Sequence, residues 1–371
     1  MTEGSRIHLP HTSNSRTIPM HDNRLTCLVP THNRPQFLRR LMRFFVQVQP
    51  QFLIRIIDSS EGSAATENRS IVDDVSHQLQ VDYQNIAQPF YEKISTGLAS
   101  VTSPFVAMCA DDDCLFPETV TRSVDFLEHE PTYESAMGHK AQLNTTKKFW
   151  PGSLKVLKGY SIDSESVLDR CRLMATQWYS NFYAVYRTPT LLHHFRIVSA
   201  NSSPKSLPQL PEMLMSQFSV LRGRAKVLPM MYSIWQRHET NWTNMVAKAL
   251  QSQPELHYEQ FRACLLEQMQ LAGIDRAEAE RLIGDWYGHY RFPEMAKLKR
   301  RLSVGEQLSR SVRGFAERFE DFVRPDQVRH CRSVRSRDLV GCQSSWQAAV
   351  NVIREYPQGI LCESDSLKRC A

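Results

Sequence analysis

Short apolar runs alternate with amphipathic stretches over the first part of the chain. Three runs have the length of strands and stop at polar clusters, namely Leu25–Val29, Phe52–Ile57 and Phe105–Cys109. The last contains no polar residue, which is typical of a central strand in a parallel sheet. After Pro35, apolar residues recur every three or four positions from Phe37 to Val48, which predicts a helix packed by one face.

Strands that alternate with helices predict an α/β fold with a doubly wound, mostly parallel sheet. The polar stretch 61–64 is expected to be a loop. Between about 133 and 245 the pattern is mixed, with helices expected at 164–174 and 211–221 and strands at 182–186 and 225–228. Beyond that the pattern is helical. We therefore expect a flexible leader over 1–23, an α/β domain over 24–245 and a mainly helical region over 246–371.

Composition indicates a soluble globular protein, with 42% apolar and 23% charged residues among 371. No apolar stretch approaches the ~20 residues that a membrane span needs, and the first twenty residues lack the apolar core of a signal peptide. The nine cysteines form no C-x-x-C pair. This usage favours neither a disulfide framework nor a zinc site, and it fits a reducing cytoplasm.

The net charge of +6 is concentrated late in the chain, where residues 297–337 contain twelve Lys or Arg and five Asp or Glu. A predicted helix with apolar residues from Leu308 to Phe322 lies within this segment. It can pack against the main domain or a second subunit, giving a homo-oligomer. The alternative is peripheral contact with an anionic membrane surface. No motif of a known nucleic-acid-binding module is present.

Polar clusters follow the three apolar strands at Thr31–Arg34, Asp58–Ser60 and Asp111–Asp113. In doubly wound sheets, ligands bind outside the carboxyl ends of the strands, so the three clusters predict one site. Carboxylates at positions i and i+2 of a turn can face one divalent cation, which would neutralise a diphosphate. The alternative is a solvated acidic cluster at the start of a helix.

The sequences Val29-Pro-Thr-His-Asn-Arg34, Ile57-Asp-Ser-Ser60 and Ala110-Asp-Asp-Asp-Cys-Leu-Phe-Pro117 resemble those of family-two glycosyltransferases with the GT-A fold. They are similar in particular to a bacterial group whose acidic motif reads A-D-D-D. The resemblance covers about 24–130 and extends less closely to about 245. It implies a GT-A-like sheet followed by a helical C-terminal region.

The resemblance implies a metal-dependent enzyme, of the kind used in polysaccharide biosynthesis. It would transfer a sugar with inversion from a nucleoside diphosphate donor, with a UDP-sugar favoured, to a glycan or lipid-linked hydroxyl acceptor. Asp111 and Asp113 would hold Mn²⁺ or Mg²⁺. The donor-binding residues that it implies are Pro30, Thr31, His32, Arg34, Asp58, Lys93, Asp111 and Asp112. Lys93 could instead be an ordinary exposed helix residue, and Asp58 a turn former at a strand end.

The family's catalytic base is an acidic residue on a late helix that precedes a strand, and Glu212 matches this position. Its ordinary alternative is a first-turn carboxylate that complements the helix dipole. Trp235 and His238 follow on the next strand. They could contact the acceptor sugar, or His238 could complete a metal shell. Burial in the core is the simpler interpretation of Trp235.

Two other functions compete with glycosyl transfer. A sugar-phosphate nucleotidylyltransferase would resemble its family in a glycine-rich loop after the first strand, and residues 30–35 contain no glycine. A non-catalytic protein with this fold would bind a partner without chemistry. Three adjacent carboxylates repel each other, which argues against that alternative because binding alone does not require them.

Overall fold

The computed structural model describes residues 22–145, 153–176, 179–201, 210–238, 254–291 and 339–355. The expected boundary near 245 and the basic segment 297–337 lie outside these residues, as does the expected leader up to residue 21. The domain division therefore remains a prediction. None of the described helices is long and apolar enough to cross a membrane.

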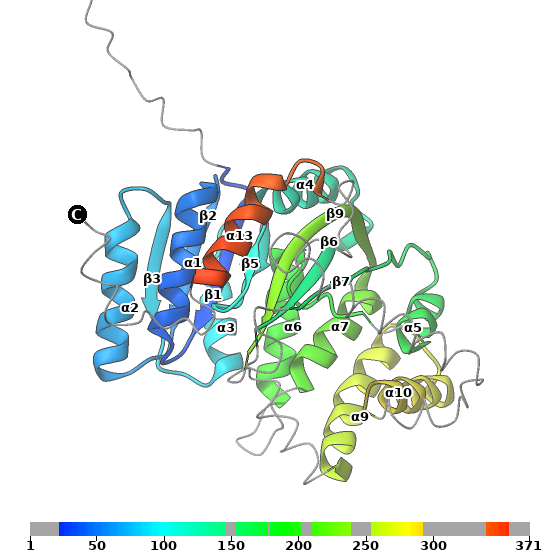
Figure 1. Cartoon of the computed structure of the whole chain (residues 1–371). Helices are drawn as coiled ribbons and strands as arrows, with labels where there is room; N and C mark the ends of the chain where they lie inside the picture. The colour runs from blue at the N-terminus through cyan, green and yellow to red at the C-terminus, as the bar shows by residue number, and fades with distance from the viewer. Residues whose placement is uncertain are drawn as a thin grey trace, which may run out of the picture.

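A single mixed sheet forms the centre of the described structure (Figure 1). Its strands are β1 (Leu25–Thr31), β2 (Leu53–Asp58), β3 (Val81–Asn85), β4 (Phe105–Met108), β5 (Cys114–Leu115), β6 (Tyr133–Asn144), β7 (Ser153–Leu157), β8 (Val185–Arg187) and β9 (Arg224–Arg237). Their order is β3-β2-β1-β4-β8-β6-β9-β5, and β7 pairs with β6. The first four strands pair in parallel, whereas β8 pairs antiparallel with both of its neighbours.

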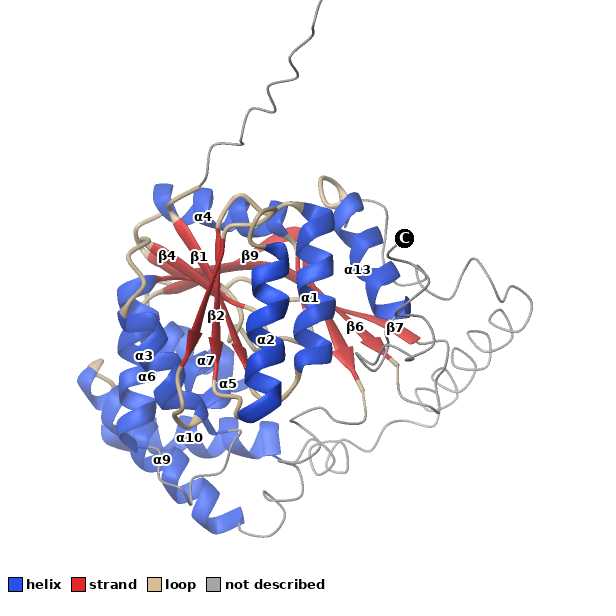
Figure 2. Cartoon of the chain, turned by 90° about the vertical axis from the view of Figure 1, so that its left-hand side faces the viewer, coloured by secondary structure: helices blue, strands red, loops and turns tan. Residues whose placement is uncertain are grey.

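Helices cover both faces of the sheet, so the expected doubly wound α/β fold is confirmed (Figure 2). One face carries α1 (Pro35–Val48) and α2 (Gly62–Val75), and the other carries α3 (Phe90–Ala99), α6 (Thr188–Asn201) and α7 (Leu210–Arg222). The helix α4 (Pro117–His129) packs on β6. Right-handed crossovers place the connecting helices on one face while the strand order runs in one direction, and on the other face after the order reverses. The order reverses between β3 and β4, so α3 lies on the face opposite α1 and α2.

The C-terminal region is helical where it is described. Two of its helices, α9 (Pro254–Leu271) and α10 (Arg276–Arg291), pack against α7 and α5 (Val167–Thr176). The last, α13 (Gln343–Glu355), returns to the first half of the chain and lies beside α1 (Figure 1). The ring of Trp346 on α13 contacts that of Phe116 edge-on, with centroids 6.3 Å apart.

Several elements differ from the sequence prediction, which did not include β5, β6, β7 or α6 and placed a loop at the start of α2. Residues 62–64, predicted to be a loop, form the start of α2, whose few buried residues include Asn68, Ile71 and Val72. A helix with so short an apolar stripe has a weak sequence signal and is held by tertiary contacts. The strand β6 was missed because its buried positions include polar side chains such as Ser135 and Lys140, which interrupt the usual alternation.

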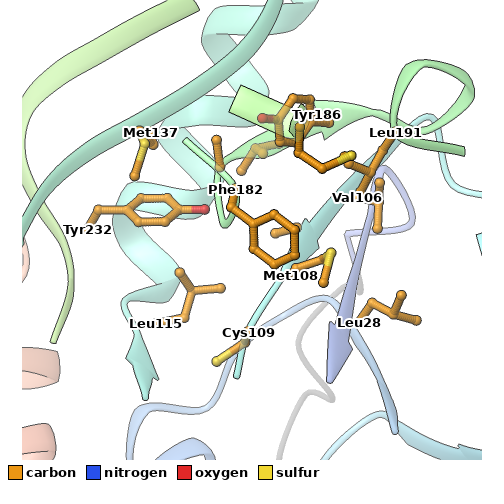
Figure 3. Close-up of a cluster of buried hydrophobic side chains, with 14 of the residues drawn as sticks. Leu28, Val106, Met108, Cys109, Leu115, Met137, Phe182, Tyr186, Leu191 and Tyr232 are labelled. Carbon is orange, nitrogen blue, oxygen red and sulfur yellow. The ribbon is translucent and has the colours of Figure 1, made fainter. Parts of the chain in front are cut away.

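The core beneath the acidic triplet consists of large apolar side chains from neighbouring strands. Figure 3 shows Phe182, Tyr186, Tyr232, Met137 and Leu115 packed together, and all are buried. Burial of each such side chain contributes roughly 1.5–3 kcal/mol. Cys109 and Cys114, on either side of the triplet, are also buried and are free thiols. The backbone that carries the triplet is therefore anchored at both ends.

Candidate functional site

The first and third polar clusters meet at the carboxyl end of the sheet. Because β1 pairs in parallel with β4, Thr31 lies close to Asp111, and its hydroxyl donates to Oδ2 of Asp111 at 2.8 Å. The guanidinium of Arg34 bridges two carboxylates, at 2.8 Å from Oδ1 of Asp111 and 2.7 Å from Oδ2 of Asp112. The structure thus brings together the residues that the sequence assigned to separate junctions.

Lys93 joins the first and second clusters. Its ammonium donates to the backbone oxygen of Thr31 at 2.7 Å and to the hydroxyl of Ser59 at 2.9 Å. Only 1% of this residue is exposed, so the alternative of an ordinary exposed helix lysine is wrong. Burial lowers the pKa of Lys93 to about 8. Its ammonium therefore links the loop after β1 to the loop after β2.

Asp58 is fully buried, with 0% of its surface exposed. Its carboxylate accepts hydrogen bonds from the backbone N–H and hydroxyl of Ser60, from Asn68 at 2.8 Å and from the hydroxyl of Tyr83 at 2.7 Å. These contacts fix the second loop and the start of α2. Contact between Asp58 and a nucleotide base or ribose stays a prediction, and the structure gives the carboxylate an internal role.

Two further residues predicted to bind the donor, Pro30 and His32, differ in exposure. Pro30 is buried in β1 beside Ile57 of β2. His32 is exposed, and its Nδ1 lies 3.0 Å from the backbone oxygen of Ser59, which can only accept a hydrogen bond. His32 therefore lies at the solvent edge of the cluster, where a ligand can reach it.

The end of β9 completes the site. The backbone N–H of Gln236 donates to Oδ1 of Asp113 at 3.1 Å, and Nε2 of His238 lies 3.0 Å from Oδ2 of Asp112. The ring of His238 stacks on Phe37 of α1 at a centroid distance of 4.7 Å. His238 is thus part of the acidic cluster, although the sequence alone gave it only a weak assignment.

Arg40 was not singled out from the sequence. It is buried, donates to the backbone oxygen of Asp112 at 2.7 Å and also hydrogen-bonds the side chain of Gln236. The available signal was its position three residues after Phe37, on the buried side of a helix. A charged residue at such a position needs a buried partner, and the acidic triplet provides it.

The three carboxylates have different protonation behaviour. Burial raises the pKa of Asp111 to about 6, and burial together with the charge of Asp112 raises that of Asp113 well above its usual range. For Asp112, the effect of burial is outweighed by His238 and Arg34, so its pKa is lowered. The neighbouring cations therefore do not fully compensate the charge that the triplet would carry with all three carboxylates ionised.

The expected metal ligands are not arranged as a ready site. Both oxygens of Asp111 are bonded, one to Arg34 and the other to Thr31. Within the described ranges, no group of three or more His, Cys, Asp or Glu side chains is placed to hold a metal ion. The donors are hard carboxylate oxygens, which suit Mg²⁺ and Mn²⁺ in chemistry. Metal binding by Asp111 and Asp113 remains a prediction.

Glu212 lies in the first turn of α7, which packs against β6 and β9. Its Oε1 accepts a hydrogen bond from the hydroxyl of Ser180 at 3.0 Å, and burial raises its pKa. Trp235 is half-buried on β9, with its ring 6.0 Å from that of Tyr183 and under the ammonium of Lys140. A carboxyl group with a raised pKa has the property required of a general base near neutral pH.

Residues 26–194 match the model of glycosyl transferase family 2. The matched span includes the three polar clusters and Lys93, but it ends before Glu212 and His238. No curated protein matches the chain significantly.

Solved structures of TarS from S. aureus have a similar fold. Residues 1–349 of TarS in complex with UDP-GlcNAc align at a TM-score of 0.51 with 16% identity, covering 91% of this chain and 92% of that one. A second structure of TarS 1–349 aligns at a TM-score of 0.50 with 15% identity, covering 91% of this chain and 93% of that one. A longer TarS chain aligns at 0.48 with 16% identity, and this chain spans 46% of it. The fold is therefore GT-A-like.

Proposed function

We propose that this protein transfers a glycosyl group from a nucleoside diphosphate sugar to a hydroxyl acceptor. The observation that carries the proposal is the convergence of the three polar clusters at one sheet edge, within the span that matches glycosyl transferase family 2. The GT-A-like fold supports it, because ligands of open α/β sheets bind at this edge. A UDP-sugar is the first donor to test, since TarS has been solved with UDP-GlcNAc.

In this proposal, Arg34 contacts the donor diphosphate, because its guanidinium is the partly exposed cation beside the triplet. His32, Thr31 and Pro30 line the nucleotide pocket, with Lys93 and Asp58 supporting the loops. Asp112 contacts the ribose or the donor sugar. These roles extend the resemblance of the motifs to the positions that the structure gives their side chains.

A divalent ion, Mn²⁺ or Mg²⁺, would be held by Asp113 together with Asp111. Asp111 becomes available for this when Arg34 leaves it to contact the diphosphate. His238 lies beside Asp112 and could complete the shell. When bound, the ion would neutralise the negative charge that develops on the leaving diphosphate. The raised pKa of Asp113 fits this role, because a nearby cation would stabilise its ionised form.

Glu212 acts as the base in this proposal. The acceptor oxygen forms a bond to the anomeric carbon while the bond from that carbon to the diphosphate oxygen breaks, and the proton of the acceptor hydroxyl moves to Glu212. Displacement from the opposite face gives inversion. We propose a glycan or lipid-linked acceptor, met in the cytoplasm or at the inner membrane surface through the basic segment 297–337.

Thermal unfolding of the full chain with a panel of nucleoside diphosphates, each with and without Mn²⁺, tests the proposal. We expect one diphosphate with Mn²⁺ to raise the melting temperature, with about 2.7 kcal/mol of stabilisation at a ligand concentration of 100 times Kd. The shift should vanish in Asp113→Ala and persist in the control Asp82→Ala, which changes a carboxylate on β3. No shift with any nucleotide would favour a non-catalytic binding protein instead.

The role of Arg34 leads to a separate prediction about affinity. Arg34→Ala is expected to weaken binding of the diphosphate about tenfold or more, because a hydrogen bond to a charged group contributes roughly 1.5–3 kcal/mol. Isothermal titration calorimetry with UDP and Mn²⁺ measures this change. Arg39→Ala is the matched control, because Arg39 lies on α1, which begins directly after Arg34, and pairs with Glu67 at the surface. Equal affinity of both variants would rule out contact between Arg34 and the diphosphate.

A further inference from the structure

A buried lysine lies beside the candidate base and has no role in the chemistry described so far. Lys140 is in the middle of β6 and is only 2% exposed. Its ammonium lies 3.9 Å from the centre of the Trp235 ring and 4.5 Å from that of Tyr179. It also donates a hydrogen bond to the backbone oxygen of Ser180. The two rings and one carbonyl thus surround the charge.

Ser180 connects Lys140 to Glu212. The backbone oxygen of Ser180 accepts from Lys140, while its hydroxyl donates to Oε1 of Glu212 at 3.0 Å. A single residue, itself buried, therefore fixes the position of the carboxylate relative to the ammonium. The contacts come from three separate parts of the chain, namely β6, the segment before β8 and α7.

The charged groups that face Lys140 are Glu212 from α7 and Asp113 from the turn after β4. Two tyrosines also lie near Glu212, Tyr91 on α3 and Tyr183 before β8. Burial raises the pKa of both, so they remain neutral near pH 7. Among the described residues, Lys140 is the cation whose charge acts on Glu212, and burial lowers the pKa of Lys140 to about 7.

We propose that Lys140 is a positioning residue for Glu212, which it orients through Ser180 and keeps ionised by its charge. The proposal rests on the role of Glu212 as base in the proposed function. An ionised carboxylate is the form that can accept the proton of an acceptor hydroxyl. In a desolvated position this form requires a nearby cation, and Lys140 supplies one without contacting the acceptor itself.

A purely structural role explains Lys140 less well. Burial of an ammonium costs several kcal/mol, and an apolar side chain of similar length would fill the space between Trp235 and Tyr179 without that cost. Methionine has such a side chain. The substitution Lys140→Met therefore separates the charge of the residue from its volume.

The first test needs no substrate. The emission of Trp235 should change with pH as the ammonium over its ring loses its proton, with a transition near pH 7 in the full-length protein. The transition should be absent in Lys140→Met and in Trp235→Phe. In Glu212→Gln it should move to lower pH, because the carboxylate charge raises the pKa of Lys140. A transition missing from the parent protein, or unchanged in Glu212→Gln, would overturn the proposal.

The second test uses turnover of the donor that binds in the thermal assay. In Lys140→Met, the acid limb of the pH profile of kcat should move about one pH unit higher, because Glu212 loses the charge that keeps it ionised. At pH values below that limb, kcat should be about tenfold lower than in the parent protein. The KM for the donor should change little, and Lys140→Arg should restore part of the activity. An unshifted profile with a lower kcat would contradict the proposal. Failure of the proposed function would appear as absent nucleotide binding, which leaves the Trp235 titration readable.

Discussion

Replacing Asp58 with alanine is expected to lower the free energy of unfolding by about 3–5 kcal/mol. The carboxylate is fully buried and accepts hydrogen bonds from Ser60, Asn68 and Tyr83. Its removal leaves buried donors without an acceptor, and each such group costs roughly 1–3 kcal/mol. Urea-induced unfolding followed by circular dichroism measures the change.

A second aspartate in the same sheet provides the control. Asp82 lies on β3, pairs with Arg55 at 2.8 Å, and its side chain is 37% exposed. An exposed ion pair contributes about 0–1 kcal/mol, so Asp82→Ala should change stability little. If Asp58→Ala and Asp82→Ala destabilised the protein equally, the internal role assigned to Asp58 would be incorrect.

The sequence predicted the first half of the fold because its signals are local. Apolar runs such as Phe105–Cys109 are typical of buried strands, and polar clusters at the carboxyl ends of parallel strands lie at the same edge of the sheet. The same reasoning predicted that Thr31 and Asp111 share a site. Where the local signal is weak, as in α2 and β6, the elements exist because of tertiary contacts that no short window contains.

The sequence could not predict which partners complete the acidic triplet. Arg40 and Gln236 are 196 positions apart, and their contact depends on how β9 is placed against α1. The burial of Lys93 and Lys140 could not be predicted either, because a lysine is ordinarily exposed and its buried partners are distant in the sequence. Residue types indicated the chemistry of the site, and the fold determined its electrostatics.

These contacts suggest that the cluster is stabilised from opposite sides. Arg34 holds Asp111 and Asp112 at the partly exposed side, where a ligand can displace it. Arg40 holds the backbone of Asp112 from the buried side. If a bound donor draws Arg34 away from these carboxylates, the turn Asp111–Asp113 would stay anchored, because Arg40 keeps its contact with the backbone oxygen of Asp112. The two arginines should accordingly differ in what their removal affects, ligand affinity for Arg34 and stability for Arg40.

Arg40→Met is expected to destabilise the protein by about 3–5 kcal/mol, since removal of one partner from a buried charged contact has this effect. Arg40 is 2% exposed, and its loss leaves the oxygen of Asp112 and the side chain of Gln236 short of a donor. Arg39→Met on the same helix should cost at most about 1 kcal/mol, because Arg39 pairs with Glu67 at the surface. Urea unfolding of both variants measures the difference, and equal stabilities would show that Arg40 does not anchor the turn.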